Sequence, residues 1–183
     1  MNIKNIVLVG MFAALLAIIS PFQIIVPFSP VPITLQVVGV TLAASILGSK
    51  LGTLSVIIYT ILGLVGLPIF AGFKSGLPTL VGPTGGYIIG FIVSAYIIGR
   101  FVELKKVCKF PYILMINILG ILMGVYFIGT IQLSIVYTHS ITKALVAGVI
   151  PYIIPEIIKL VFSSILIVQV RKVLSKAGLL PGN

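Results

Sequence analysis

Long runs of apolar residues, almost free of charge, follow one another through most of this chain. A helix needs about 20 predominantly apolar residues to cross the hydrocarbon core of a bilayer. Only 8% of the 183 residues are charged, whereas soluble domains average about 25%. Cutting the chain at Gly, Pro and charged residues gives spans near residues 6–27, 31–48, 51–67, 84–102, 111–136 and 148–171. The sequence therefore predicts an all-α membrane protein, with six transmembrane helices in a single integral membrane domain over residues 1–183.

The first twenty residues have one property of a secretory signal peptide, because Lys4 precedes an apolar stretch. The apolar run continues past Ser20 through Ile24, Ile25 and Val26, and several equally hydrophobic segments follow. We therefore expect this segment to be retained as the first spanning helix.

Two connections between the predicted spans have distinct compositions. Residues 48–52, GSKLG, are long enough only for a turn, so we expect the second and third spans to form a tight antiparallel hairpin. Residues 67–83 are too rich in Gly and Pro for a helix and too apolar for a solvated loop. We expect this second connection to fold back onto the protein.

Basic residues gather at one end of the predicted spans. If the N-terminus is cytoplasmic, nine fall on the inner face and two, Lys74 and Lys143, on the outer face. The nine are Lys4, Lys50, Arg100, Lys105, Lys106, Lys109, Arg171, Lys172 and Lys176. This bias predicts a multi-pass protein of the cell (plasma) membrane, with N-terminus and C-terminus cytoplasmic and structured outer loops at 21–30, 67–83 and 137–147. A pocket built from these loops would open outward. Because the orientation of the spans accounts for the basic residues, the net charge of +10 does not indicate a nucleic-acid partner.

The inventory of reactive side chains argues against catalysis. Two acids, one histidine and one cysteine are too few for a paired-aspartate site, an HExxH motif or a metal cluster of standard spacing. Cys108 alone can form neither an internal disulfide nor a four-ligand zinc site, and His139 lies in a polar stretch typical of an exposed connection. The segment GFKS around Lys74 lacks the GxxxxGK[ST] pattern of a phosphate loop. We expect no enzyme, no metal, no cofactor and no ATP hydrolysis by this chain.

Glu156 and Lys159 both fall within the last apolar span, IIPEIIKLVFSSIL. An ionisable group facing the hydrocarbon costs several kcal/mol, so intramembrane charges usually face the protein interior. At a spacing of three residues they share a helix face and can partly neutralise each other, and Pro155 fits the first turn of a helix. The pair either stabilises the helix bundle or points into a polar cavity, where it offers one acceptor and one donor to a solute.

Four other polar side chains have two interpretations each. Gln36, near the outer end of the second span, either forms interhelical hydrogen bonds or contacts a solute. Tyr59 and Tyr87 are either interfacial anchors or ligand contacts, and the anchor role is preferred for Tyr59. Lys74 in the outer loop is either a solvated charge or a partner for an anion.

Small residues form a strip along the first span, at Gly10, Ala13, Ala14 and Ala17. Small side chains let a second helix approach closely. The strip alone does not distinguish a contact inside the bundle from a contact with a partner protein.

Four sequence runs resemble the BioY-type biotin-binding subunits of energy-coupling-factor (ECF) vitamin importers. They are SPVPITLQ (29–36), LGSKLGTLSVIIYTILGLVGLPIFAG (47–72), GPTGGYIIGF (82–91) and IPYIIPEIIK (150–159). The resemblance covers about residues 10–172 and implies a six-helix S-component, with a biotin pocket closed by outer loops. It also implies docking through the first helix, with Ala13 and Ala17 facing a transmembrane coupling subunit driven by two ATPase subunits.

Two departures from the family pattern fall where the ligand should sit. The family's last-helix motif usually reads P-G-D-x-x-K, whereas here Glu156 directly follows Pro155 and Lys159 matches the lysine. The glycine-rich outer loop reads AGFKSG, with Lys74 where a neutral residue is usual. We expect Glu156 to accept from the ureido N–H groups of biotin, and Lys159 or Lys74 to pair with the valerate carboxylate. Apolar walls would come from Phe70, Tyr87 and residues 67–83.

Three alternatives remain at this point. The chain could be an S-component for another small vitamin. It could be a stand-alone membrane facilitator, although the sequence gives no span a sustained polar stripe that would line a pore. It could also be a structural membrane protein in which Glu156 and Lys159 only stabilise the bundle.

Overall fold

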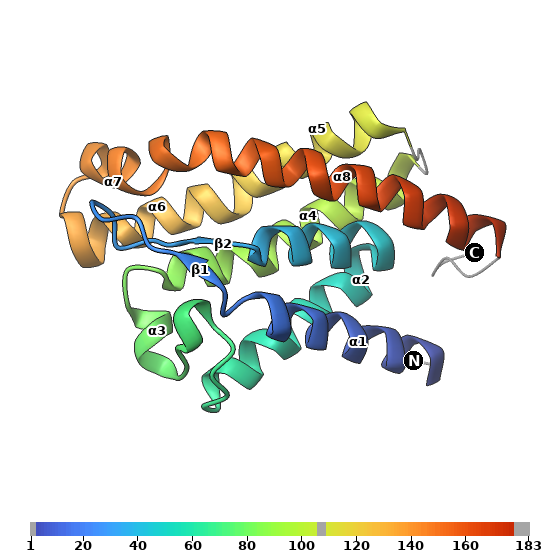
Figure 1. Ribbon diagram of the computed structural model, residues 1–183, viewed down its shortest axis with the longest axis horizontal. Helices are drawn as coiled ribbons and strands as arrows, with labels where there is room; N and C mark the ends of the chain where they lie inside the picture. Colours follow the sequence, from blue (N-terminus) through green and yellow to red (C-terminus); the bar gives the residue numbers. More distant parts are fainter. Residues whose placement is uncertain (1–2, 106–108, 178–183) are drawn as a thin grey trace.

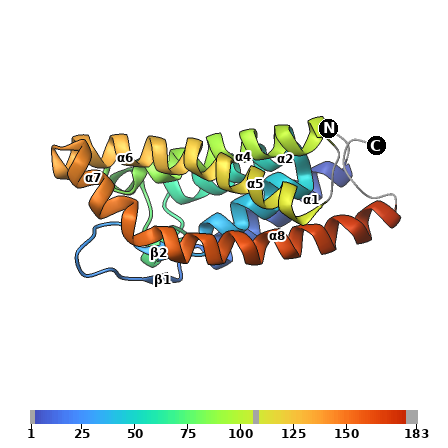
Figure 2. The same cartoon turned by 90° about the horizontal axis from the view of Figure 1, so that it is seen from above.

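The computed structural model describes residues 3–105 and 109–177, which form one elongated bundle of roughly parallel and antiparallel helices. The start of α1 (Ile3–Ile19) and the end of α8 (Ile153–Lys176) lie at the same end of this bundle (Figures 1 and 2). The opposite end carries the β1–β2 loop, α3 and α7, and is called the pocket end below (Figure 1).

Helix α2 (Gln36–Leu64) is a hairpin of two arms. The chain reverses at Gly48, whose φ of 82° lies in the left-handed region that favours glycine. Gly52 then packs on the backbone of the first arm at Ala43 and Ala44. Glu103 caps the start of the second arm. Ser49 donates its backbone N–H and its hydroxyl to the two carboxylate oxygens of Glu103, each at 2.7 Å. The two arms correspond to the predicted spans 31–48 and 51–67, and they form the hairpin expected there.

Helix α4 (Gly85–Lys105) lies at the centre of the bundle, between α2 and the next long helical stretch. That stretch comprises α5 (Phe110–Ile121), the π-helical turn η2 (Leu122–Tyr126), α6 (Phe127–Leu133) and a second π-helical turn, η3 (Ser134–Thr138). Gly90 and Gly124 bring the two helices into backbone contact, since a Cβ at Gly90 would lie 2.6 Å from the Gly124 carbonyl oxygen. Small residues at this crossing therefore set the distance between α4 and η2.

The chain reaches the pocket end along α5 and α6, turns there through α7 (Ile141–Gly148) and the 3-10 turn η4 (Ile150–Tyr152), and runs back along the bundle in α8. His139, just before α7, is exposed, as expected for a connection. Cys108 and Lys106 lie outside the described residues.

The pocket end has more regular structure than the sequence suggests. Helix α1 ends at Ile19 rather than near residue 27, because Pro21 disfavours helical conformation in the residue before it. A two-stranded antiparallel ribbon follows, in which β1 (Gln23–Ile24) pairs with β2 (Ile33–Thr34). Residues 67–83 contain the 3-10 turn η1 (Ala71–Phe73) and the short helix α3 (Leu77–Val81), so the expectation that Gly and Pro exclude any helix there is wrong.

Among the described residues, four stretches are long and apolar enough to cross a membrane by length and composition: Gln36–Leu64, which is the whole α2 hairpin, Gly85–Lys105, Phe110–Thr138 and Ile141–Lys176. Helix α1 is a shorter apolar helix. Many large apolar side chains on α1, α5, α6 and α8 are exposed on the outside of the bundle. A hydrophobic exterior of this kind fits a lipid environment rather than water.

Candidate ligand-binding pocket

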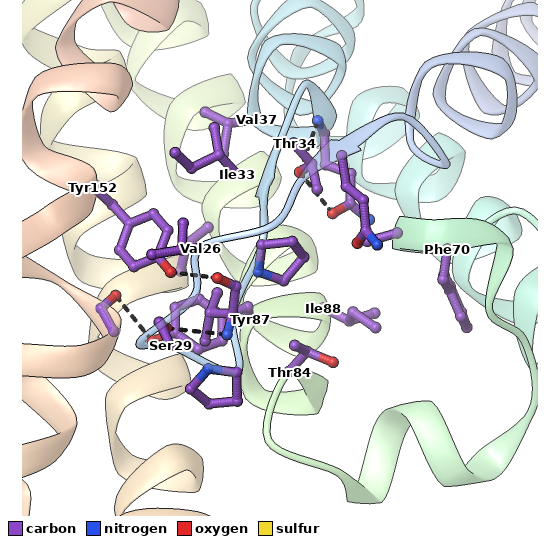
Figure 3. A pocket seen from close by; sticks show the side chains of 18 of the residues that line it. Val26, Ser29, Ile33, Thr34, Val37, Phe70, Thr84, Tyr87, Ile88 and Tyr152 are labelled. Atoms are coloured by element: carbon purple, nitrogen blue, oxygen red, sulfur yellow. Dashed lines mark hydrogen bonds between the residues drawn. The ribbon is translucent and has the colours of Figure 1, made fainter.

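A cavity of about 220 Å³ lies at the pocket end. Its walls come from the loop between α1 and α2, the segment around η1, helix α4, the π-helical turn η2, the 3-10 turn η4 and α8 (Figure 3). Five side chains predicted as ligand contacts line this one cavity: Gln36, Lys74, Tyr87, Glu156 and Lys159. The fold therefore brings together residues that are up to 123 positions apart, from Gln36 to Lys159.

Glu156 is buried, with only 7% of its surface exposed, and sits in the first turn of α8. Its Oε2 atom lies 2.7 Å from the Nζ atom of Lys159 and accepts a 3.3 Å hydrogen bond from the Tyr126 hydroxyl. Its Oε1 atom is also buried but accepts no hydrogen bond from any residue that the structure describes. Buried polar atoms are almost always paired, so an orphaned carboxylate oxygen on a cavity wall is an acceptor suited to a ligand N–H.

Lys159 is engaged on two sides within the protein. Besides the ion pair with Glu156, its Nζ atom donates a 3.0 Å hydrogen bond to the backbone carbonyl of Thr34 in β2. Its charge is therefore already compensated, and two of its three N–H donors have acceptors. This geometry makes Lys159 a residue that positions the Glu156 carboxylate and the β2 backbone.

Gln36 belongs to a buried hydrogen-bond chain at the cavity wall. Its Oε1 atom accepts from the Thr34 hydroxyl at 2.9 Å, and its Nε2 atom donates to the Tyr59 hydroxyl at 2.8 Å. Tyr59 in turn donates to the Ile69 carbonyl at 3.2 Å. Tyr59 is 0% exposed, and its hydroxyl both accepts and donates a hydrogen bond inside the protein. The preferred prediction that Tyr59 is an interfacial anchor is therefore wrong. A long aromatic residue in an apolar span gives the same sequence signal for both roles.

Aromatic rings form two walls of the cavity. Phe70 is fully buried and makes an edge-to-face contact with Tyr59, with 5.7 Å between ring centroids. Its ring fits against Gly63, where a Cβ would lie 2.2 Å from the ring edge. On the other wall Tyr87 packs edge-to-face with Tyr126 at 6.4 Å and donates to the Gly148 carbonyl at 3.1 Å.

Lys74 is exposed on the solvent side of the cavity lining. Its backbone carbonyl accepts a hydrogen bond from the Phe70 N–H at 3.0 Å, which closes the η1 turn and fixes where the side chain starts. An exposed ammonium at the rim of an apolar cavity is placed to meet the anionic end of a ligand.

The comparison with known proteins agrees with this arrangement. The family model of the BioY family matches residues 1–176. The chain belongs to the BioY family.

Relatives in the BioY family match this chain over most of its length. The biotin transporter BioY of Thermotoga maritima is 40% identical over 169 residues, covering 92% of this chain and 96% of the relative. The probable biotin transporter BioY of Pyrococcus horikoshii is 43% identical over 159 residues, covering 87% and 91%. A crystal structure of the S-component for biotin from an ECF-type ABC transporter superposes with a TM-score of 0.86 at 30% identity, covering 93% of this chain and 92% of that one. The bundle described above is therefore the BioY fold.

Several lining residues of this BioY-family pocket were missed by sequence reasoning. They are Gln23, Ser29, Thr79, Thr84, Tyr126 and Tyr152. Tyr126 points toward Glu156 because it lies in the π-helical turn η2, which changes the direction of side chains relative to a regular helix. No spacing pattern in the sequence marks such a turn. Proximity to Pro151 and Pro155 was a usable signal for Tyr152, since prolines mark the helix start at the pocket end.

The first helix of this BioY-family chain presents a different face from the one predicted. Ala13 is 1% exposed, because it packs against α2, and Ala17 is half-buried against the same core. The expectation that Ala13 faces a partner therefore does not agree with the structure. The exposed small residues of α1 are instead Gly10 and Ala14. A Cβ at Gly10 would meet nothing within 4 Å.

Proposed function

We propose that this chain is the substrate-binding S-component of an ECF-type importer and that it binds biotin in the cavity at the pocket end. The buried Oε1 atom of Glu156, which has no hydrogen-bond partner among the described residues, is the observation that carries the proposal. Biotin presents two ureido N–H groups and a carboxylate at opposite ends, so a site for it needs an acceptor deep in the pocket and a cation near the rim. Glu156 and Lys74 provide these two groups on one cavity.

Each end of biotin is given a partner in this proposal. The Glu156 carboxylate accepts from the ureido ring, and the charge assistance makes this bond stronger than a neutral one. Lys74 pairs with the valerate carboxylate, while Phe70 and Tyr87 cover the apolar ring and chain. Lys159 was a candidate for the valerate carboxylate, but its contacts with Glu156 and the Thr34 carbonyl support a positioning role.

The proposed location is the cell membrane, with both termini cytoplasmic and the pocket facing outward. Support comes from the charges of the described residues. Lys4, Lys50, Arg100, Lys105, Lys109, Arg171, Lys172 and Lys176 belong to the end opposite the pocket or to the helix turns leading to it, whereas Lys74 and Lys143 lie at the pocket end. A positive-inside distribution places the more basic end in the cytoplasm. Biotin then enters from outside and is delivered inward.

Inward delivery requires an energy source, which we assign to an ECF module of a transmembrane coupling subunit and two ATPase subunits. The proposed docking surface is the exposed face of α1 that carries Gly10 and Ala14. Small side chains there let a helix of the coupling subunit approach closely. The chain itself is proposed to bind and present the vitamin without chemical conversion.

A ligand screen on the purified protein in detergent tests the proposal. Calorimetric titration with biotin, desthiobiotin, lipoate, thiamine and riboflavin should give tight binding of biotin and weaker binding of desthiobiotin, which keeps the ureido group. Tight binding of another vitamin in place of biotin would assign the chain to a different S-component. Absence of ATPase subunits after mild purification from cells that carry them would contradict the module assignment, and would favour a stand-alone facilitator.

A further inference from the structure

The loop between α1 and α2 forms the outer wall of the cavity, yet it has little structure of its own. Nine of its residues line the cavity: Gln23, Ile25, Val26, Ser29, Pro30, Val31, Pro32, Ile33 and Thr34. Its ribbon pairs only two residues on each strand, and two-stranded ribbons are marginal when isolated. Pro27, Pro30 and Pro32 have no backbone N–H to donate. The position of this wall therefore depends on contacts with the rest of the protein.

Two side chains of the C-terminal segment hold the loop by its backbone. The Nζ atom of Lys159 holds the Thr34 carbonyl at the base of the ribbon, at 3.0 Å. The Tyr152 hydroxyl donates to the Val31 carbonyl near the tip of the loop. Figure 3 shows the Tyr152 ring pointing across the cavity wall toward the loop that carries Val26 and Ser29.

Tyr152 is itself firmly placed. It is 4% exposed, and it packs in the same core cluster as Val26 and Val31, two buried valines of the loop. It ends the 3-10 turn η4, and its backbone N–H donates to the Val149 carbonyl at 3.0 Å. The loop therefore rests on a rigid residue, whereas its side chains Phe22, Ile25 and Phe28 are exposed.

We propose that Tyr152 is a positioning residue that latches the 21–34 loop closed over the cavity and thereby sets the rate at which bound ligand leaves. The proposal rests on the binding function assigned to the cavity above. Loss of the hydroxyl leaves the Val31 carbonyl without its donor and frees the tip of the loop, while Lys159 still holds the base. The open loop exposes the cavity to solvent, so ligand dissociates faster. Tyr152 acts here through the loop backbone, independently of any contact that its ring makes with ligand.

The variant Tyr152→Phe removes one oxygen atom and keeps the ring, and Tyr137→Phe is the matched control. Tyr137 is also at the pocket end, but it is 56% exposed and does not line the cavity. In the absence of ligand, hydrogen exchange of the Ser29 and Val31 amides, which are hydrogen-bonded near the tip of the loop, should become about tenfold faster in Tyr152→Phe, as expected for loss of one buried hydrogen bond. Exchange in α4 should not change. Incorporation of 4-aminophenylalanine in place of Tyr152 restores a donor at the same position and should restore slow exchange.

With biotin bound, tracer-exchange measurements should give about tenfold faster dissociation for Tyr152→Phe and unchanged dissociation for Tyr137→Phe. Unchanged amide exchange in Tyr152→Phe would overturn the latch, even if dissociation became faster, because the tyrosine would then be only a ligand contact.

If the wild-type protein does not bind biotin, the binding proposal fails, whereas the exchange experiment still decides the latch. If Tyr152→Phe does not purify in a folded form, the comparison between wild type and the 4-aminophenylalanine protein decides it: faster loop exchange despite the restored donor would contradict the latch.

Discussion

The ammonium of Lys159 lies 2.7 Å from one carboxylate oxygen of Glu156, and the other oxygen of that carboxylate is buried on the cavity wall without a hydrogen-bond donor among the described residues. A buried ion pair is costly to desolvate and gives little net stability compared with well-packed apolar residues. Its position on the cavity wall therefore supports the proposed role in ligand binding. The same pair connects the proposed ligand site to β2, because Lys159 also donates a hydrogen bond to the Thr34 carbonyl.

Separate removal of the two charges should destabilise the protein more than their joint removal. Glu156→Gln leaves a buried ammonium and Lys159→Met leaves a buried carboxylate, and breaking such a pair costs about 3–5 kcal/mol. The double variant Glu156→Gln with Lys159→Met should regain most of this loss. Thermal unfolding in detergent measures the stabilities, and additivity of the two single effects would contradict the pairing.

Biotin binding should follow a different pattern in the same three variants. Glu156→Gln removes the charged acceptor, so affinity should fall by about tenfold or more, and it should stay low in the double variant even though stability returns. Wild-type affinity in Glu156→Gln and in Lys159→Met together would rule out this pair as the ligand site. The double variant thus separates the role in stability from the role in recognition.

The contribution of Lys74 should depend on the charge of the ligand. Lys74→Gln should weaken biotin binding about fivefold, which corresponds to ~1 kcal/mol for an exposed ion pair. The same substitution should leave binding of biotin amide unchanged, because the amide has no carboxylate charge. Lys143→Gln on α7 is the matched control, since Lys143 is exposed at the same end but does not line the cavity. An equal effect of Lys74→Gln on both ligands, measured by titration at fixed ionic strength, would place the carboxylate elsewhere.

The hairpin of α2 should tolerate no side chain at its reversal. Gly48→Ala places a Cβ 2.3 Å from a carboxylate oxygen of Glu103, in a left-handed conformation. Gly66→Ala has the same kind of backbone strain, with φ of 110°, but meets nothing within 4 Å. We expect Gly66→Ala to cost ~1 kcal/mol of unfolding free energy and Gly48→Ala to cost more, because it also displaces the carboxylate that caps the second arm. Equal melting temperatures for the two variants would show that Glu103 does not stabilise the hairpin.

The features that the sequence could predict are those that depend on composition along the chain. Charges inside an apolar span are rare and expensive, so Glu156 and Lys159 were recognisable before any geometry was known. The hairpin was predictable because five residues around Gly48 allow only a turn. In contrast, Tyr126 reaches Glu156 through a π-helical turn, and such a turn has no spacing signature.

The buried face of α1 was not predictable for a related reason. This helix is apolar all round, so hydrophobic periodicity does not indicate which side packs inward. The strip of small residues contains two overlapping candidates, and only the packing against α2 separates Ala13 from Ala14. Tyr59 is a similar case, because a tyrosine in an apolar span signals an anchor and a buried hydrogen-bond partner equally well.

The two faces of α1 should respond differently to larger side chains. Ala14→Leu and Gly10→Leu enlarge the exposed face, so they should reduce co-purification with a coupling subunit while biotin affinity and melting temperature stay near those of the wild type. Ala13→Leu enlarges a fully packed position and should instead lower the melting temperature, at a cost of about 1–3 kcal/mol for overpacking. Quantitative co-purification from cells that express the whole importer measures the first effect, and thermal unfolding of the isolated subunit measures the second. Normal complex formation by both Gly10→Leu and Ala14→Leu would move the docking surface away from this face of α1.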